Sequence, residues 1–302
     1  MITIVTPTYN RAHLLPRLRE SLCAQTCKDF EWLVIDDGST DGTEEMFENG
    51  NVDGNVDGNG NVDVGFPVRY IRKENGGKHT ALNVGIMEAT GDMILIVDSD
   101  DALLEDAVET VIEKYEEIKD DKSYCGVCGY MQHSDGTVIG SPLPHDEINA
   151  SSLELRYKYG VTGDMIEVFR TDVLREFLFP EIKGERFCPE ALVWNRIAAK
   201  YKMRVFNKCI YIRDYLDGGL TSKIVRIRCE SPIASAITYQ ELTTYDVPLV
   251  VRLRAAINYW RFRLCGDASK MPRLSWWLNV MMPLGWLMHL RDRGNFQRER
   301  ER

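Results

Sequence analysis

The chain has 302 residues, 44% of them hydrophobic and 27% charged, which is typical of a globular protein and excludes a disordered or fibrous one. The formal net charge of −9 argues against a general nucleic-acid binder. The charge is uneven, because residues 252–302 contain eleven Lys or Arg and four Asp or Glu, a net +7, which leaves −16 on the first 251 residues. An acidic body with a basic tail indicates two different environments.

The cysteines and the apolar segments are both consistent with a cytoplasmic location. Cys125 and Cys128 have the spacing of half a zinc site, but no second pair matches it, so we expect reduced thiols in the core. The chain begins with a strand-like run rather than a signal peptide. The longest apolar stretch, residues 275–290, is too short for a transmembrane helix and contains Pro283 and Gly285.

The first hundred residues alternate between short β-branched runs and helical patterns. Strands are predicted at 2–6, 32–35, 68–71 and 93–97, and helices at 14–22, 40–48 and 80–89. Repeated β-α units predict an α/β fold with a mostly parallel sheet flanked by helices. Ligands of such sheets bind beyond the carboxyl ends of the strands, which here carry residues 6–11, 36–39 and 98–101.

An insertion at residues 49–65 separates the second predicted helix from the third strand. It contains Val-Asp-Gly-Asn twice, at 52–55 and 56–59. The spacing lacks the terminal Glu of an EF-hand, and two repeats are too few for a calcium β-roll. We therefore expect a solvated insertion rather than a calcium site.

The pattern changes after residue 101. A hairpin around residues 134–136 is predicted to join strands at 124–132 and 137–139. Further strands are predicted at 165–169 and 204–212, with helices at 107–118 and 189–201. From about residue 230 only helices are predicted, including 248–264 and 274–290.

Three carboxylates follow the fourth predicted strand, at Asp98, Asp100 and Asp101. Oxygen-rich clusters of this kind suit Mg²⁺ or Mn²⁺, which commonly bridge a diphosphate. The alternative is a helix N-cap with acidic residues favoured by the helix dipole. Asp37 ends the second strand in the same way, and it can accept hydrogen bonds from a ribose or a base, or simply cap a turn.

Two more segments carry groups suited to a nucleotide. Residues 6–11 offer backbone groups, an aromatic ring and a cation. Residues 76–79, Gly-Gly-Lys-His, open the third helix, where free N–H groups and Lys78 can hold anionic oxygens. This segment is not the familiar phosphate loop, and His79 alone is more often structural than catalytic.

Together, in this order, these segments resemble the inverting glycosyltransferases of family two, of bacterial surface-polysaccharide type, which have the GT-A fold for nucleotide-diphospho-sugars. The resemblance is dense over residues 1–110, weaker to about residue 222 and says little about the tail. The matching segments are Ile4–Arg11, Leu33–Asp41, Asn75–Gly77, Ala81–Ile86, Ala89–Asp92 and the D-x-D motif of Asp98–Asp101.

The resemblance implies a nucleotide-sugar donor, with UDP the expected nucleotide, and Mn²⁺ or Mg²⁺ as cofactor. It implies transfer of a hexosyl or N-acetylhexosaminyl group to a saccharide or lipid-linked saccharide, in cell-surface polysaccharide or glycolipid assembly. Asp98 and Asp100 would bind the metal. The residues that would bind the donor are Thr6, Pro7, Tyr9, Arg11, Asp37, Lys78, Asp98 and Ser99.

The catalytic base is expected near the start of a helix well after the D-x-D motif. Glu190 follows Pro189 and precedes an apolar helix, so it is the candidate. Family members often have a Glu-Asp pair there, and residue 191 is Ala, which leaves Glu185 and Asp164 as rivals.

Two other functions compete with glycosyl transfer. A nucleotidyltransferase on a related sheet also uses carboxylates and a metal, but residues 6–10 lack the Gly-rich, basic signature of such enzymes. A non-catalytic sugar-nucleotide-binding protein is the second alternative, and the intact acidic residues argue against it.

The expected organisation is a nucleotide-sugar-binding half at 1–101, an acceptor-binding half at 102–222 and a C-terminal helical extension at 223–302. The extension combines Trp276, Trp277 and Trp286 with flanking arginines. That composition is typical of segments at a bilayer interface, so 252–302 is expected to contact an anionic membrane at its inner face. The alternatives are a helix packed on the catalytic domain or a homo-oligomer contact.

Overall fold

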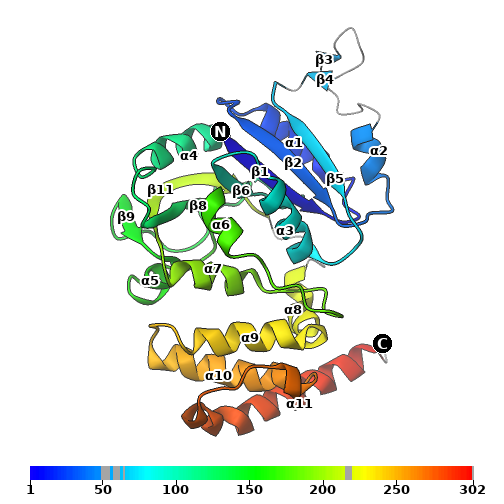
Figure 1. Ribbon diagram of the computed structural model, residues 1–302, viewed down its shortest axis with the longest axis vertical. Helices are drawn as coiled ribbons and strands as arrows, with labels where there is room; N and C mark the ends of the chain where they lie inside the picture. The colour runs from blue at the N-terminus through cyan, green and yellow to red at the C-terminus, as the bar shows by residue number, and fades with distance from the viewer. Residues whose placement is uncertain (49–54, 57–61, 64, 215–219, 301–302) are drawn as a thin grey trace. The chain divides into compact units, whose positions relative to one another are not determined.

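The computed structural model describes residues 1–48, 55–56, 62–63, 65–214 and 220–300 (Figure 1). The chain divides into two compact units, Met1–Leu178 with Lys200–Asp214, and Phe179–Ala199 with Tyr215–Arg302. Most of the predicted insertion at 49–65 lies outside the described residues. Within it, β3 (Asn55–Val56) and β4 (Val62–Asp63) pair in antiparallel fashion.

A nine-stranded sheet forms the first unit, in the order β5-β2-β1-β6-β10-β8-β11-β7, with β9 paired to β11. Among the described strands, β5, β2, β1, β6, β8 and β11 run one way and β10, β7 and β9 the other. The predicted α/β fold with a mostly parallel sheet is confirmed. The strands are β1 (Ile2–Thr8), β2 (Phe30–Asp36), β5 (Val68–Arg72), β6 (Met93–Ile96), β7 (Ala102–Leu103), β8 (Tyr124–Gln132), β9 (Glu147–Ala150), β10 (Met165–Arg170) and β11 (Lys202–Ile212).

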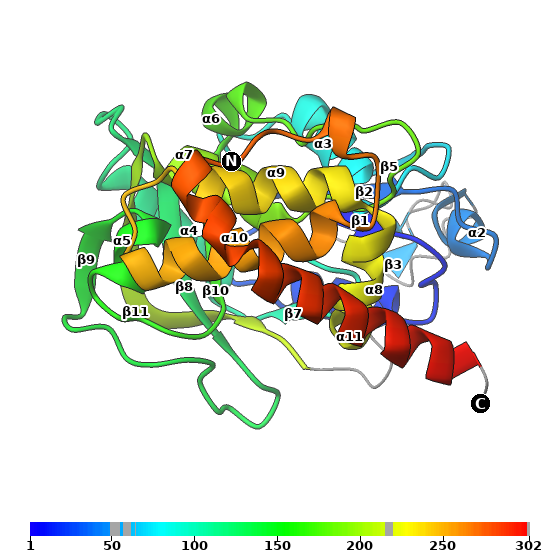
Figure 2. The ribbon, with the colours of Figure 1, turned by 90° about the horizontal axis from the view of Figure 1, so that it is seen from below.

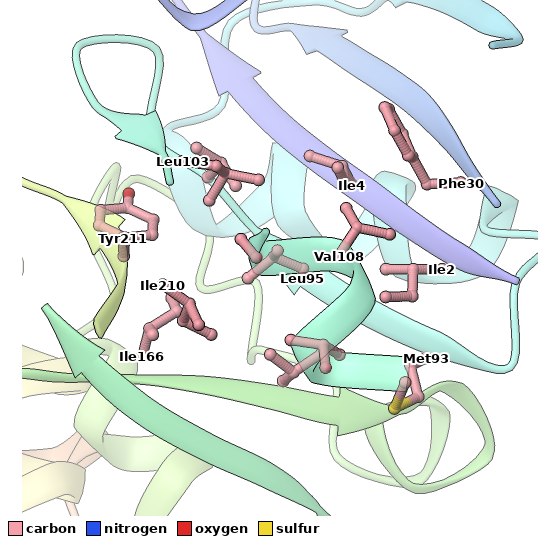
Figure 3. Packing of buried hydrophobic residues seen from close by; sticks show 14 of the residues in the cluster. Ile2, Ile4, Phe30, Met93, Leu95, Leu103, Val108, Ile166, Ile210 and Tyr211 are labelled. Carbon is pink, nitrogen blue, oxygen red and sulfur yellow. The ribbon is translucent and has the colours of Figure 1, made fainter. Parts of the chain in front are cut away.

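Helices cover both faces of this sheet. On one face, Ile2 and Ile4 of β1 pack in a core with residues of α1 and α4, and Figure 3 shows Ile4, Leu95 and Val108 in that core. On the other face, Gly85 of α3 lies so close to β1 that a Cβ there would meet Val5 Cγ1 at 2.4 Å. The helices of the first unit are α1 (Leu15–Cys23), α2 (Thr43–Glu48), α3 (Lys78–Glu88), α4 (Ala107–Glu116), α5 (Ser152–Tyr157) and α6 (Thr171–Glu176).

Most predicted elements are present with shifted ends. β1 continues through Pro7 to Thr8 instead of ending at Thr6, because Thr6–Thr8 stay in register with β2. The predicted hairpin turn forms, but its second arm is a single bridge between Gln132 and Val138. β7, β9, α5 and α6 were not predicted. All eight cysteines are free, and Cys125 and Cys128 are buried, as predicted.

The second unit is helical in its described part and contains α7 (Glu190–Ala198), α8 (Leu220–Glu230), α9 (Pro232–Leu242), α10 (Leu249–Arg263) and α11 (Met282–Arg300). The predicted helix at 274–290 is wrong in part, because Trp276–Met281 form a 3₁₀ helix (η2) and α11 begins only at Met282. Figure 2 shows α9, α10 and α11 stacked together. No described helix is long and apolar enough to cross a membrane. The functional boundaries at residues 101 and 222 stay predictions.

Candidate active site

The carboxyl ends of β1, β2 and β6 lie side by side, because these strands are parallel neighbours. Thr8 is in register with Asp36, and the N–H of Val97 donates to the carbonyl of Val5 at 2.9 Å. This pairing brings the three strand-end loops of the sequence prediction to one edge of the sheet. The loops of residues 9–11, 37–39 and 98–101 can therefore serve one ligand.

Asp98, Asp100 and Asp101 form the acidic cluster of this edge. Their carboxylate oxygens all lie within 4.8 Å of one another, and among the described residues this is the group with metal-binding geometry. Lys78 Nζ contacts the two carboxylate oxygens of Asp98 at 2.6 and 2.9 Å. Arg11 Nη1 donates to Asp100 Oδ2 at 2.6 Å. Two cations, Arg11 of the first loop and Lys78 at the start of α3, therefore offset part of the negative charge of the cluster.

The pKa values of Asp98 and Asp101 shift in opposite directions. Burial opposes ionisation of Asp98, but Lys78, Arg213 and Arg11 outweigh it and hold the pKa of Asp98 below its usual value. Asp101 is buried, and its pKa rises to about 7 through burial and the nearby charges of Asp98 and Asp100, although a hydrogen bond from Tyr211 opposes the shift. A cation bound at this place would therefore stabilise the ionised form of Asp101.

Tyr211 is a site residue that sequence reasoning missed. Its hydroxyl donates to Asp101 Oδ2 at 2.7 Å and accepts the N–H of Asp98 at 3.2 Å. Tyr211 lies in β11, more than a hundred residues along the chain. The pairing of β11 with β7 and β8 brings it here, so the sequence carried no local signal for it.

A divalent cation fits this group. Three carboxylates at one point are the hard oxygen ligands that Mg²⁺ and Mn²⁺ prefer. The cluster is also partly accessible, since the Asp98 and Asp100 side chains are about a third and a quarter exposed. The predicted D-x-D residues therefore come together, with Asp101 added to them, while buried Ser99 lies between.

Asp37 is held by a different set of partners. Its Oδ1 accepts the N–H of Gly76 at 2.9 Å and Lys73 Nζ at 2.7 Å, and its Oδ2 accepts the N–H of Gly77 at 2.7 Å. The carboxylate thereby fixes the turn that opens α3, the helix that begins at Lys78. Asp37 positions the loop of Lys78 in this structure, and its contact with a ribose stays a prediction.

The residues of the first loop separate into inner and outer groups. Thr6 is buried and accepts a hydrogen bond from Trp32 Nε1 at 3.0 Å, and Pro7 is buried in β1. Tyr9 is 49% exposed. Asn10 adopts a φ of 52°, and its side chain accepts the N–H of Thr40. Of the predicted donor residues in this loop, Tyr9 and Arg11 therefore present their side chains for contact.

The three candidates for the base have different surroundings. Both Glu185 oxygens accept backbone N–H groups at the start of α9, from Ile233 at 2.6 Å and Ala234 at 2.9 Å. Asp164 pairs with Arg213 at 2.8 Å. Glu190 is the first residue of α7, and its side chain is half-buried. Glu190 belongs to the second unit, and the acidic cluster to the first.

Comparisons with known proteins agree with this arrangement. Residues 3–175 match the family described as Glycosyl transferase family 2. Glycosyltransferase GlyG of Streptococcus pneumoniae is 29% identical over 232 residues, 73% of this chain and 72% of that protein. A Campylobacter jejuni enzyme named GalNAc(5)-diNAcBac-PP-undecaprenol beta-1,3-glucosyltransferase is 28% identical over 210 residues, 68% of this chain and 61% of that protein.

Solved structures share the fold at low identity. Staphylococcus aureus TarS 1–349 in complex with UDP-GlcNAc aligns with a TM-score of 0.58 and 19% identity, over 89% of this chain and 74% of that one. A mannosyltransferase of Pyrobaculum calidifontis in complex with GDP-Man and Mn²⁺ aligns with a TM-score of 0.56 and 16% identity, over 96% and 87%. The family match covers more than half of the chain, and the chain belongs to glycosyl transferase family 2.

Proposed function

We propose that this glycosyltransferase moves a sugar from a UDP-sugar to an acceptor hydroxyl with inversion of configuration, using a divalent metal at Asp98, Asp100 and Asp101. The convergence of these three carboxylates, faced by Lys78 and Arg11, is the observation that carries the proposal. The complexes of TarS with UDP-GlcNAc and of the mannosyltransferase with GDP-Man and Mn²⁺ support a nucleotide-sugar donor and a metal.

The charges of the strand edge suit a departing diphosphate. Asp98, Asp100 and Asp101 would hold a divalent cation, which would offset negative charge on the leaving nucleoside diphosphate. Lys78 and Arg11 now pair with the same carboxylates, so both cations lie where the diphosphate would be bound. Their long side chains can exchange a carboxylate for a phosphate oxygen at little cost, because both ligands are anionic oxygens.

Glu190 is the proposed base. Its carboxylate takes the proton of the acceptor hydroxyl while the hydroxyl oxygen bonds to the anomeric carbon. The bond from that carbon to the diphosphate oxygen breaks, and the nucleoside diphosphate leaves with the electron pair. Glu185 is less suited to this role, since both of its oxygens already accept backbone N–H groups at the start of α9.

The acceptor is proposed to be a saccharide on a lipid carrier, in cell-surface polysaccharide or glycolipid assembly at the cytoplasmic side of the membrane. The name of the Campylobacter relative, which specifies an undecaprenol-linked acceptor, supports this class. The transferred sugar is proposed to be a hexosyl or N-acetylhexosaminyl group.

The Glu190→Gln variant tests the reaction, because Gln keeps the shape but cannot accept the proton. We expect kcat to fall by about 10² or more while the dissociation constant of the UDP-sugar stays unchanged. The measurement is product formation from a panel of UDP-sugars with Mn²⁺, beside donor affinity by calorimetry. A variant that keeps its kcat, or that loses only affinity, contradicts the assignment of Glu190.

Two controls make the result specific. Wild-type protein with a nucleoside triphosphate and a sugar phosphate should form no nucleotide sugar, as expected for a glycosyltransferase. The Asp164→Asn variant should retain its kcat within a few-fold, because Asp164 pairs with Arg213 and is not the proposed base. A loss of kcat in this variant equal to that of Glu190→Gln would move the base to Asp164.

A further inference from the structure

The last helix of the second unit, α11, exposes large apolar residues and buries small and polar ones. Its buried positions are Gly285, His289 and Asp292, whereas the large apolar residues Leu284, Leu287 and Leu290 are exposed. Gly285 lets α11 approach α10 closely, since a Cβ there would lie 2.4 Å from Trp260 Cβ. A helix in water ordinarily buries its apolar side. The exposed apolar side of α11 is therefore a candidate surface for binding a partner or a membrane.

The exposed apolar residues continue onto η2. Trp276 is 85% exposed, and Val280 also faces outward. We call this set the apolar face; it consists of Trp276, Trp277, Val280, Met282, Leu284, Trp286, Leu287 and Leu290. In Figure 2, α11 lies beside α10 and α8, and these three helices supply the lining of the cavity described next.

A basic cavity adjoins the apolar face. It has a volume of about 410 Å³, and its lining residues include Lys223, Arg226, Arg261, Arg291, Asp292 and Phe296. Arg291 connects the cavity with the apolar face, because Leu287 lies four residues before it on the same side of α11.

The charge of the basic cavity is only partly neutralised. Asp292 is paired within the protein, since Arg261 donates to its two oxygens at 2.5 and 2.8 Å. Arg226 stacks over the ring of Phe296 at 5.0 Å. The described residues provide no carboxylate partner for Lys223 or Arg291. The described lining residues include four Lys or Arg and one Asp, a basic composition that suits a phosphate group.

We propose that the apolar face docks on an anionic phospholipid bilayer and that the basic cavity receives a headgroup phosphate. Trp rings and leucines enter the interfacial region of a bilayer, and Lys and Arg beside them meet anionic headgroups. A second copy of the chain fits less well, because a symmetric pairing would bring the arginines of one face toward those of the other. The docking does not depend on the proposed reaction.

The test is co-sedimentation of the full chain with phosphatidylcholine vesicles, with and without phosphatidylglycerol, at low and high salt and without donor or metal. We expect binding that requires phosphatidylglycerol and weakens with salt. Leu287→Gln should weaken binding by about tenfold, as expected when one large apolar side chain no longer leaves water. Met87→Gln is the matched control, because Met87 and Leu287 are both 55% exposed and Met87 lies on α3.

The contribution of the basic cavity is tested separately. Arg291→Gln should weaken binding to the anionic vesicles by about fivefold, the effect of about 1 kcal/mol for each basic residue near such a surface. Arg156→Gln on α5 makes the same change of net charge in the first unit and should leave binding unchanged. Inorganic phosphate at constant ionic strength should compete only weakly, because it lacks the apolar contribution.

Several results would overturn the proposal. The proposal fails if the full chain stays in the supernatant with anionic vesicles at low salt, or if Leu287→Gln binds as well as Met87→Gln. Binding of inorganic phosphate without any binding of vesicles would make the cavity a site for free anions instead. A dimer in solution that Leu287→Gln dissociates would show that a second copy covers the apolar face.

Discussion

Two acidic loops at neighbouring strand ends look alike in sequence and are held in opposite ways. Asp37 follows β2 and accepts hydrogen bonds from two backbone N–H groups and from Lys73. Asp98 and Asp100 follow β6 and are held by the ends of two long side chains, Lys78 and Arg11. Backbone donors are fixed by the fold, whereas long cationic side chains can change partner. The first loop is therefore a scaffold, and the second can exchange its partners for a metal and a diphosphate.

The largest expected effect comes from the exchangeable loop. Asp100→Ala should lower glycosyl transfer by about 10³, since a bound metal contributes several kcal/mol to transition-state stabilisation. The free energy of unfolding should change little, because the Asp100 side chain is partly exposed and Arg11 stays in contact with water. Activity with Mn²⁺ and chemical denaturation measure the two quantities, and EDTA treatment of the wild type should reproduce the loss of activity. Full activity after either treatment would contradict the metal assignment.

The scaffold loop should respond in the opposite way. Asp37→Ala leaves the N–H groups of Gly76 and Gly77 without their acceptor, so the free energy of unfolding should fall by about 2–3 kcal/mol. Urea denaturation followed by circular dichroism gives this number. Activity should also fall, since the turn that presents Lys78 loosens. An Asp37→Ala variant as stable as Asp100→Ala would remove the distinction between the two loops.

The positions of the two loops were predictable from sequence, but the partners of each carboxylate were not. The alternation of β-branched runs and helical patterns predicted the parallel strands, and their carboxyl ends predicted which loops would meet. The three donors to Asp37 are 36 to 40 residues away, and the hydroxyl beside Asp101 belongs to Tyr211. Those contacts depend on the turn that opens α3 and on the pairing of β11 with β7.

In the second unit, too, the packing partner of a segment could not be predicted from the sequence. The stretch of Trp and Leu residues near the C-terminus was evident, yet the sequence could not say which side of α11 is buried. Gly285 decides it, because only a residue without a Cβ fits against Trp260. Once that contact forms, Leu287 and Leu290 must face outward.

The smallest expected effect concerns a third carboxylate, Glu185, which extends the comparison to the second unit. Glu185 resembles Asp37, because backbone N–H groups hold both of its oxygens, here at the start of α9. Gln at this position keeps one acceptor oxygen and loses the negative charge that favours the positive end of the helix. Glu185→Gln should therefore lower the free energy of unfolding by about 1 kcal/mol, the net worth of one hydrogen bond, with kcat within a few-fold of the wild type.

Thermal unfolding and steady-state kinetics, run beside Glu190→Gln, separate the two glutamates. Glu190→Gln should lose kcat and keep its stability, whereas Glu185→Gln should lose stability and keep its kcat. A reversal of these two results would make Glu185 the base. A carboxylate held by backbone N–H groups would then also be a working catalytic group, and the way in which a carboxylate is held would no longer distinguish scaffold from chemistry in this protein.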